Sequence, residues 1–264
     1  ATLGLTLAPS WAPSSAVPAQ GAARAAAPTA QSVEQLSFPQ APGVTVDADR
    51  IVTISIPASV LDESIGSFGS AVLEGDFAPG QNVAEIGLGR NGDNWASTIG
   101  PLPPGLYRYR VRADDLKIAA DTTNPNKVSS DPTWRTFFIP GDKIALLADP
   151  PAAKRGTMHH LKYGKQTAHV WTPAGYDAKR RQPYPVLFLN SGKDIDSHDW
   201  LDLGRAGQIV DNLTAQGRVE PTVVVIAGDT ERGLKDLRRE VERGFHVARD
   251  AEHRAVAGVA AGAD

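Results

Sequence analysis

The residues that suggest chemistry most directly are Gly258-Val-Ala-Ala-Gly262. Their spacing is that of the G-x-S-x-G nucleophile elbow, a tight strand-to-helix turn whose flanking glycines let the central side chain meet a substrate. The central residue here is Ala260, and its methyl group cannot attack a carbonyl. The alternative is that an Ala/Gly-rich segment imitates the motif by chance. The preceding hundred residues favour a genuine elbow position.

Residues 158–264 alternate between apolar runs and helical patterns, as an elbow requires. The predicted strands are 167–172, 184–189, 222–226 and 254–259, and the predicted helices are 204–216 and 234–243. Continuous apolar strands that alternate with helices predict a parallel sheet with both faces covered. In the first helix, Ile209 and Leu213 are expected to face the sheet, with Asp211 and Gln216 in solvent.

Residues 32–141 have the pattern of short strands separated by turns. Val52, Ile54 and Ile56 alternate with polar residues, and the tyrosines of segment 107–112 alternate with arginines. A period of two places one set of side chains inside a half-buried antiparallel sheet. Turn signals at 78–80, 91–93, 103–105 and 124–125 have the spacing of a small β-sandwich. No helix is expected within it.

Two motifs of this segment are similar to immunoglobulin-like modules that precede catalytic domains in secreted esterases and glycogen-branching enzymes. They are the PLPPGLYRY run at 101–109 and the D-x-x-N-P run at 121–125. Such modules are often called carbohydrate-binding modules, so the resemblance implies a sugar ligand. Trp95 and Trp134 are the candidate stacking platforms, although packing in the core is the favoured role for such tryptophans.

Segment 170–258 resembles the esterase D family of α/β-hydrolases, which includes feruloyl, acetyl-xylan and enterochelin esterases and mycolyltransferases. The shared elements are VWTPAGY at 170–176, YPVLFL at 184–189, GRA at 204–206, DNL at 211–213, PTVVV at 221–225 and HRAVAG at 253–258. The resemblance implies acyl transfer by a Ser-His-Asp/Glu triad with two backbone N–H groups that hold the oxyanion.

The oxyanion residues carry over only in part. The nucleophile position is Ala260, and Ala261 keeps a backbone N–H that can serve as one oxyanion donor. The family's Leu-His-Gly-Gly-Gly segment reads Asn190-Ser-Gly-Lys-Asp194 here, so Ser191 and Gly192 are the candidates for the second donor. The two charged residues replace glycines that normally let that donor face the substrate.

Two further departures concern larger segments. The connection between strand 222–226 and the elbow is shorter than in the family, so part of one cleft wall is expected to be missing. The acid and the histidine of the triad follow the elbow in this fold, and the two residues after Gly262 are not expected to supply them. The expectation is a chain without esterase activity, in which strand 255–259 leaves an unpaired apolar edge.

The six histidines are expected to be ordinary surface or strand-end residues. None has an H-E-x-x-H spacing, and His159 and His160 are adjacent, so that their rings point to opposite faces of a strand. Four aspartates at 194, 196, 199 and 202 lack the glycine and terminal glutamate of a calcium loop, and a solvated loop is expected. No metal and no cofactor are predicted.

The composition and charge of the chain limit the kinds of partner that it is expected to bind. The 264 residues suffice for two domains, and 27 Lys+Arg against 30 Asp+Glu give a net charge of -3. This balance indicates neither a nucleic-acid surface nor a polybasic membrane patch. With 0 Cys there are no disulfides or thiolate nucleophiles. No later apolar run approaches the ~18 residues that span a bilayer. Nothing indicates an oligomeric state.

Residues 1–31 are rich in Ala, Pro and Ser and resemble the remainder of a secretory signal, with a small-residue cleavage pattern at Val17-Pro-Ala19. A disordered low-complexity leader is the alternative. The expected organisation is therefore a leader at 1–31, a sandwich at 32–141, a linker at 142–157 and an incomplete hydrolase domain at 158–264. Secretion is expected.

Three functions remain open from the sequence. The first is an esterase-family protein that is inactive as this chain stands. The second is a non-catalytic carbohydrate-binding protein, and the third is a decayed esterase fragment. The expected ligand is a polysaccharide or a small ester.

Overall fold

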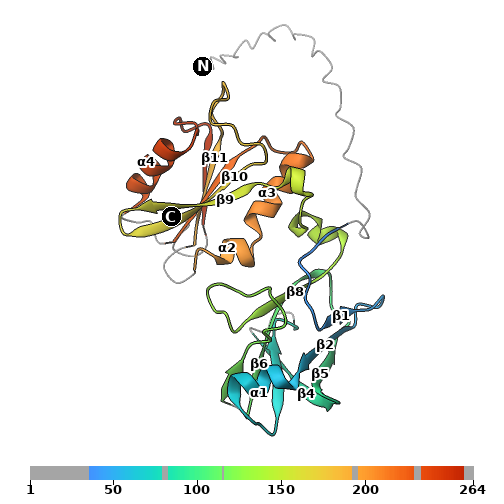
Figure 1. Ribbon diagram of the computed structural model, residues 1–264. Coiled ribbons are helices and arrows are strands. Elements are labelled where there is room, and N and C mark those ends of the chain that lie inside the picture. Colours follow the sequence, from blue (N-terminus) through green and yellow to red (C-terminus); the bar gives the residue numbers. More distant parts are fainter. Residues whose placement is uncertain (1–35, 79–82, 115, 192–195, 229–232, 259–264) are drawn as a thin grey trace, which may run out of the picture. The chain divides into compact units, whose positions relative to one another are not determined.

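The computed structural model describes residues 36–78, 83–114, 116–191, 196–228 and 233–258. An N-terminal antiparallel β domain is followed by a mixed sheet with helices (Figure 1). This arrangement confirms the predicted fold class of a β domain followed by an α/β-hydrolase-like part. Within these ranges, no helix is both long enough and apolar enough to cross a bilayer.

In the part of the N-terminal domain that the structure describes, there are eight strands. They are β1 (Val44–Val46), β2 (Val52–Pro57), β3 (Ala71–Gly75), β4 (Ala84–Asn91), β5 (Asn94–Ile99), β6 (Gly105–Ala113), β7 (Lys117–Ala119) and β8 (Arg135–Ile139). All pairings are antiparallel, in the order β1-β2-β5-β4-β3-β6-β7, with β8 also paired to β6. Strands from both ends of this path contribute to one core, so the ladder folds over on itself.

The predicted alternation is confirmed in β2 and β6. Val52, Ile54 and Ile56 are fully buried, as are Tyr109 and Val111. The arginines between them point to the other face of β6 and pair with acids on the neighbouring segment. Arg108 pairs with Asp76, and Arg110 and Arg112 both pair with Glu74, at 2.6–2.7 Å.

The helix-free prediction for this domain is wrong at one place. Helix α1 (Ala58–Ile65) follows β2 directly. Ala58 and Leu61 are buried and Ile65 packs against the same core, which is the i, i+3, i+7 spacing of an amphipathic helix. Eight residues give only two turns, so the helical period is too brief to stand out among strand signals.

The described residues of the α/β part form five strands and three α-helices. The strands are β9 (Thr157–Tyr163), β10 (Gln166–Thr172), β11 (Val186–Asn190), β12 (Val223–Ala227) and β13 (Arg254–Gly258), and the helices are α2 (Asp199–Asp202), α3 (Ala206–Ala215) and α4 (Leu234–Gly244). The strand order is β13-β11-β12-β10-β9.

The prediction of a parallel sheet is wrong for two of these strands. β11, β12 and β13 are parallel, whereas β10 is antiparallel to both β12 and β9. β9 and β10 form a hairpin in which Tyr163 pairs with Gln166 across a two-residue turn. Gly164 occupies that turn with a φ of 55°, as a hairpin turn requires. Most of β9 lies where the sequence shows no apolar run, which hid the hairpin.

Helices cover both faces of the sheet, as predicted (Figure 1). Leu237 and Val241 of α4 pack on one face, together with Val170, Val186 and Val225. The α2 and α3 helices lie on the other face, where the buried residues are Leu189, Ala206, Val224 and Ile226.

The contact face of α3 differs from the prediction. Ala206 and Val210 meet the sheet, whereas Ile209 and Leu213 are only half-buried. Gly207 explains why the helix presents a different face to the sheet than predicted, because a Cβ there would lie 2.7 Å from the Trp171 ring. The absence of a side chain lets the helix approach the indole closely.

The predicted linker contains two short 3-10 helices, Asp142–Leu147 and Ala152–Lys154. Asn212 of α3 donates hydrogen bonds to the carbonyls of Leu146 and Ala148, both at 2.9 Å. Arg205 adopts a left-handed backbone conformation and pairs with Asp149 at 2.5 Å. The side chains of Asn212 within α3 and of Arg205 just before it therefore hold the connecting segment in place.

Candidate functional site

The carboxyl ends of β11, β12 and β13 meet at one edge of the sheet. Asn190, the last residue of β11, is in register with Ala227 and with Gly258. This is the end of the strands at which α/β folds bind ligands. Ser191 is the residue immediately after β11. Among the predicted site residues, Gly192, Ala260 and Ala261 lie outside the described residues.

Ser191 is the one predicted oxyanion residue that the structure describes. It is fully buried, and its backbone N–H donates to the Ala227 carbonyl at 3.1 Å. Its hydroxyl donates to the same carbonyl at 3.3 Å. An oxyanion donor must point at the place where charge develops. In this conformation the Ser191 N–H is used by a contact between β11 and β12 instead.

β13 forms an edge among the described residues, where its pairing is with β11 alone. Ala255, Val256 and Ala257 are exposed, and Val256 retains 59% of its accessible surface. The expected apolar edge is present over this stretch. Residue 259, which was also expected in it, lies outside the described residues.

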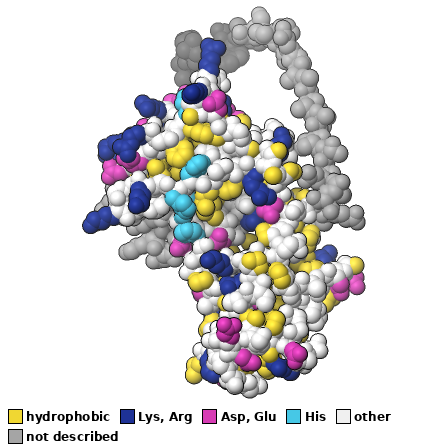
Figure 2. Space-filling model, in the orientation of Figure 1, with side chains coloured by type: hydrophobic (Ala, Val, Ile, Leu, Met, Phe, Trp, Pro, Cys, Tyr) yellow, Lys and Arg dark blue, Asp and Glu magenta, His cyan; other side chains and the backbone are white. Residues whose placement is uncertain are grey.

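Three histidines lie close together near the carboxyl end of β12, and the sequence did not suggest this cluster. His169 of β10 is in register with His160 of β9, and their ring centroids are 5.2 Å apart. His198, which precedes α2, lies 4.2 Å from the His169 ring. Histidine side chains are grouped on this face of the molecule (Figure 2). The hairpin register creates the first contact, so a hairpin turn recognised at Gly164-Lys165 is the signal that would have revealed it.

His169 is the buried member of the cluster. It is 3% exposed, and its Nδ1 has no hydrogen-bond partner among the described residues. Burial lowers the pKa of His169, and the neighbouring imidazoles His198 and His160 lower it further. His198 in turn shares a 2.8 Å hydrogen bond with Asp196. Within the described ranges, no group of three potential ligands has the geometry to hold a metal ion.

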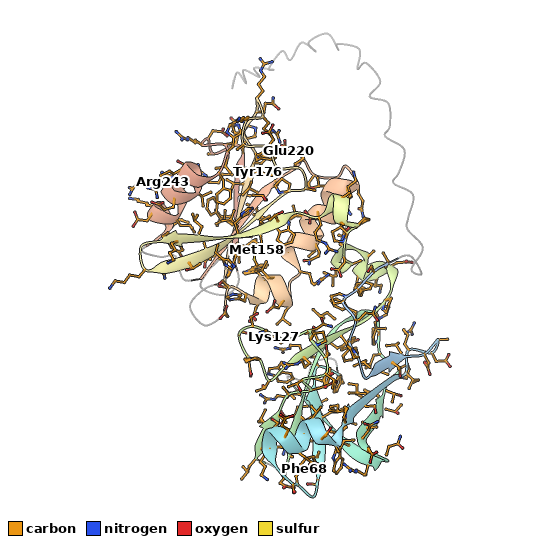
Figure 3. The ribbon with its side chains drawn as sticks, viewed as in Figure 1. Phe68, Lys127, Met158, Tyr176, Glu220 and Arg243 are labelled. Carbon is orange, nitrogen blue, oxygen red and sulfur yellow. The ribbon has the colours of Figure 1, made fainter. Side chains whose placement is uncertain are left out.

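His159 lies on the opposite face of β9 from His160, as their adjacency predicts. Its Nε2 is 3.0 Å from the Thr172 hydroxyl, and its ring contacts Phe245. Met158, the residue that precedes His159 on β9, is labelled in Figure 3.

The prediction that Asp211 faces solvent is wrong. The side chain is 2% exposed and accepts hydrogen bonds from the Gly156 N–H at 2.7 Å and from Trp171 Nε1 at 3.2 Å. Burial raises the pKa of this carboxyl. Asp211 therefore joins α3 to the residues before β9 and to β10. Gln216, which was also expected in solvent, is exposed.

The two candidate sugar platforms have different surroundings. Trp134 is 8% exposed, and the guanidinium groups of Arg108 and Arg110 lie 5.0 and 4.5 Å from the centre of its ring. Trp95 is half-buried and stacks on Phe68, which Figure 3 labels, at 5.0 Å. Both indoles pack against other side chains, and a ligand-binding role for them stays a prediction.

A cavity of about 510 Å³ lies at the opposite edge of the sheet, beside the amino ends of β11 and β13. Its lining includes Pro183, Glu220, Phe245, Asp250 and His253. His253 forms a 2.7 Å hydrogen bond with Asp250, which raises the pKa of the imidazole. The cavity is remote from the strand ends at which Ser191 lies.

Comparison with known proteins supports the observed architecture. Residues 163–257 match the esterase family model, described as "Putative esterase". An endo-1,4-β-xylanase/feruloyl esterase of Xylanibacter ruminicola is 26% identical over 227 residues, which cover 68% of this chain and 30% of that protein. The chain thus spans about a third of this relative's length.

Among solved structures, the enterobactin esterase of Shigella flexneri with 2,3-dihydroxy-N-benzoyl-serine has a TM-score of 0.51 and 14% identity. The match covers 83% of this chain and 66% of that one, so it includes both the β domain and the α/β part. The C-terminal part of this chain is therefore similar to the esterase family model over residues 163–257, and its fold is α/β-hydrolase-like.

Proposed function

We propose that this chain is an esterase-family protein that lacks serine-based acyl transfer and retains a ligand-binding edge. The observation that carries the proposal is the residue at the elbow position. β13 ends at Gly258, level with the ends of β11 and β12, and Ala260 follows two residues later. The side chain that should form the acyl-enzyme is a methyl group.

The chemistry of the fold makes this substitution decisive for covalent catalysis. A serine at this point attacks the ester carbonyl while a histidine removes its proton, and the alcohol leaves from a tetrahedral intermediate. Ala260 offers no lone pair, so neither the carbon–oxygen bond of an acyl-enzyme nor the proton transfer that accompanies it can form. The engaged N–H of Ser191 weakens the case for oxyanion stabilisation at the same edge.

The ligand that we propose is a small ester of the kind cleaved by feruloyl, acetyl-xylan or enterochelin esterases, or the polysaccharide that carries it. The esterase relationship of residues 163–257 supports this class. Secretion from the cell is proposed with it, because such a ligand is extracellular and because residues 1–31 resemble a signal segment.

Stopped-flow hydrolysis of p-nitrophenyl acetate and methyl ferulate tests the loss of catalysis. We expect neither a burst nor steady release above the buffer blank. A burst with an acyl group trapped on the protein would contradict the proposal. Isothermal titration with methyl ferulate tests the retained edge, since heat of binding without turnover is the expected result and the absence of binding would remove the ligand part of the proposal.

A further inference from the structure

The histidine cluster joins three separate segments of the α/β part. His160 comes from β9, His169 from β10 and His198 from the turn that leads into α2. The ring planes cross at 73° between the first two and at 63° between the last two. His169 is therefore covered by the other two imidazoles, and its own exposure is only 3%.

The contacts of His169 suit the neutral imidazole alone. Its Nδ1 is buried without a hydrogen-bond partner among the described residues, so a proton on that atom would have nothing to bond. Asp196 and Asp202 are the acids near enough to favour the charged form, but burial and the two adjacent imidazoles outweigh them and lower the pKa of His169. Asp196 is also committed to His198 at 2.8 Å.

The segment that covers His169 has two hydrogen bonds outside the histidine cluster: Asp202 accepts one from the Ser129 N–H at 2.7 Å, and Asp199 accepts one from the Ser130 hydroxyl at 2.6 Å. α2 has only four residues, and no side chain of it is fully buried. Trp200 and Leu201 supply its apolar contact with the sheet, next to Trp171. A change in charge beneath this segment can thus be relieved by moving the segment, without breaking the sheet.

We propose that the His160–His169–His198 contact is a pH-operated latch, which holds segment 196–202 on the sheet at neutral pH and releases it in acid. In the released form, water reaches His169 and solvates its proton. The latch depends on these imidazoles and not on the residue at position 260, so it stands apart from the proposed loss of catalysis.

The direction of the effect follows from proton linkage. The released form has His169 in water, where imidazole binds a proton as pH falls through ~6.5. The latched form binds that proton only at a lower pH. The released form therefore binds more protons between these two values, and the latched form loses stability as pH falls below ~6.5. Above that pH the latch is fully stable.

The location gives the latch a consequence for ligands. His169 is in register with Ile226 of β12, one residue before the carboxyl end of that strand. Ser191 follows β11, and Gly258 ends β13, at this same end of the strands. Acid release of segment 196–202 would therefore change the surface at the end where an ester ligand is proposed to bind.

Hydrogen exchange of the full chain, followed by mass spectrometry between pH 7.5 and pH 5.0 and corrected for the intrinsic rate, tests the latch. We expect protection of peptides within 199–205 to fall at least tenfold at pH 5.0, while peptides from β6 stay unchanged. In His169→Gln, which carries no titrating ring, the fall should disappear. The exposed His253→Gln is the matched control and should behave like the unmodified protein.

Equal loss of protection in the unmodified chain and in His169→Gln would overturn the latch, as would the absence of any loss. If His169→Gln does not fold at pH 7.5, His198→Gln decides the question. It removes the ring above His169 and leaves the buried ring in place, so the fall should shrink by at least threefold. An unchanged fall in His198→Gln would also overturn the proposal.

Discussion

Asp211 was expected in solvent because of its residue type, but its hydrogen-bond partners explain why it is buried. An aspartate in a helix normally faces water, yet this one receives one backbone and one indole N–H. Its neighbour Gly207 brings α3 close enough to Trp171 for the second bond. The carboxylate is thus a link between a helix, a strand and the segment before β9, and its loss should be felt in stability.

We expect Asp211→Ala to lower the free energy of unfolding by about 1–3 kcal/mol, because two N–H donors lose their acceptor in a buried place. Urea denaturation followed by circular dichroism measures this. Gln216→Ala, at the exposed end of the same helix, is the control and should change stability by less than about 0.5 kcal/mol. Equal effects of the two variants would contradict the assigned role of Asp211.

A serine introduced at position 260, the proposed nucleophile position, should not give this chain esterase activity. A serine hydroxyl needs an aligned base and oxyanion donors to act, and the described donor candidate, Ser191, is already bonded to Ala227. We expect Ala260→Ser to release p-nitrophenol at the blank rate, as should the neighbouring control Ala261→Ser. Turnover by Ala260→Ser alone would show that the rest of the site is intact.

Among the elements, β13 combines an apolar sequence with an unshielded position. Its described residues pair with β11, and the exposed Val256 lies midway along it. Unpaired apolar edges recruit other strands, and a lysine on such an edge is a common protection.

Val256→Lys should therefore reduce self-association of the 264-residue chain and leave its fold unchanged. The expected result is a lower scattering signal on heating and a larger monomer fraction in size-exclusion chromatography. The stability change should stay within about 0.5 kcal/mol, because the side chain is mostly in water already. Val225→Lys, on fully buried β12, is the contrasting variant and should prevent folding. Unaltered aggregation in Val256→Lys would exclude the edge as its cause.

In the molecule as a whole, the β domain has a core of its own. Residues of α1 and of seven strands, β2 to β8, fill one continuous cluster that includes Leu61, Leu73, Val111 and Phe137. Hydrogen bonds join the D-x-x-N-P motif to β6 and β8 inside this domain. Tyr109 donates to Asp121 at 2.7 Å, and Asn124 donates to the Thr136 carbonyl at 3.0 Å. Burial raises the pKa of Tyr109, so the phenol remains a donor.

We expect residues 32–141, prepared alone, to unfold in one cooperative thermal transition and to remain monomeric. Residues 142–264, prepared alone, should aggregate at micromolar concentration because β13 is left as an apolar edge. Circular dichroism melts and size-exclusion chromatography measure both. A cooperative, high-temperature melt of the soluble C-terminal fragment would contradict this view of the molecule.

The sequence by itself predicted many of the strands and helices, although not α1 or β9, and it showed the residue type at the proposed elbow position. Alternation in β2 and β6, the apolar runs of β11 and β12 and the helical patterns of α3 and α4 are local signals, because each depends on residues close in the chain. Ala260 is likewise legible without a structure, since it is a matter of residue type.

Only the tertiary structure decided which residues meet. The antiparallel direction of β10, the burial of Asp211 and the contact of His160, His169 and His198 depend on pairings between distant segments. The hydrogen bond of the Ser191 N–H also depends on such a pairing, because its acceptor, Ala227, lies on β12. Periodicity reports which face of an element is apolar, but the register and direction of strands set what that face touches.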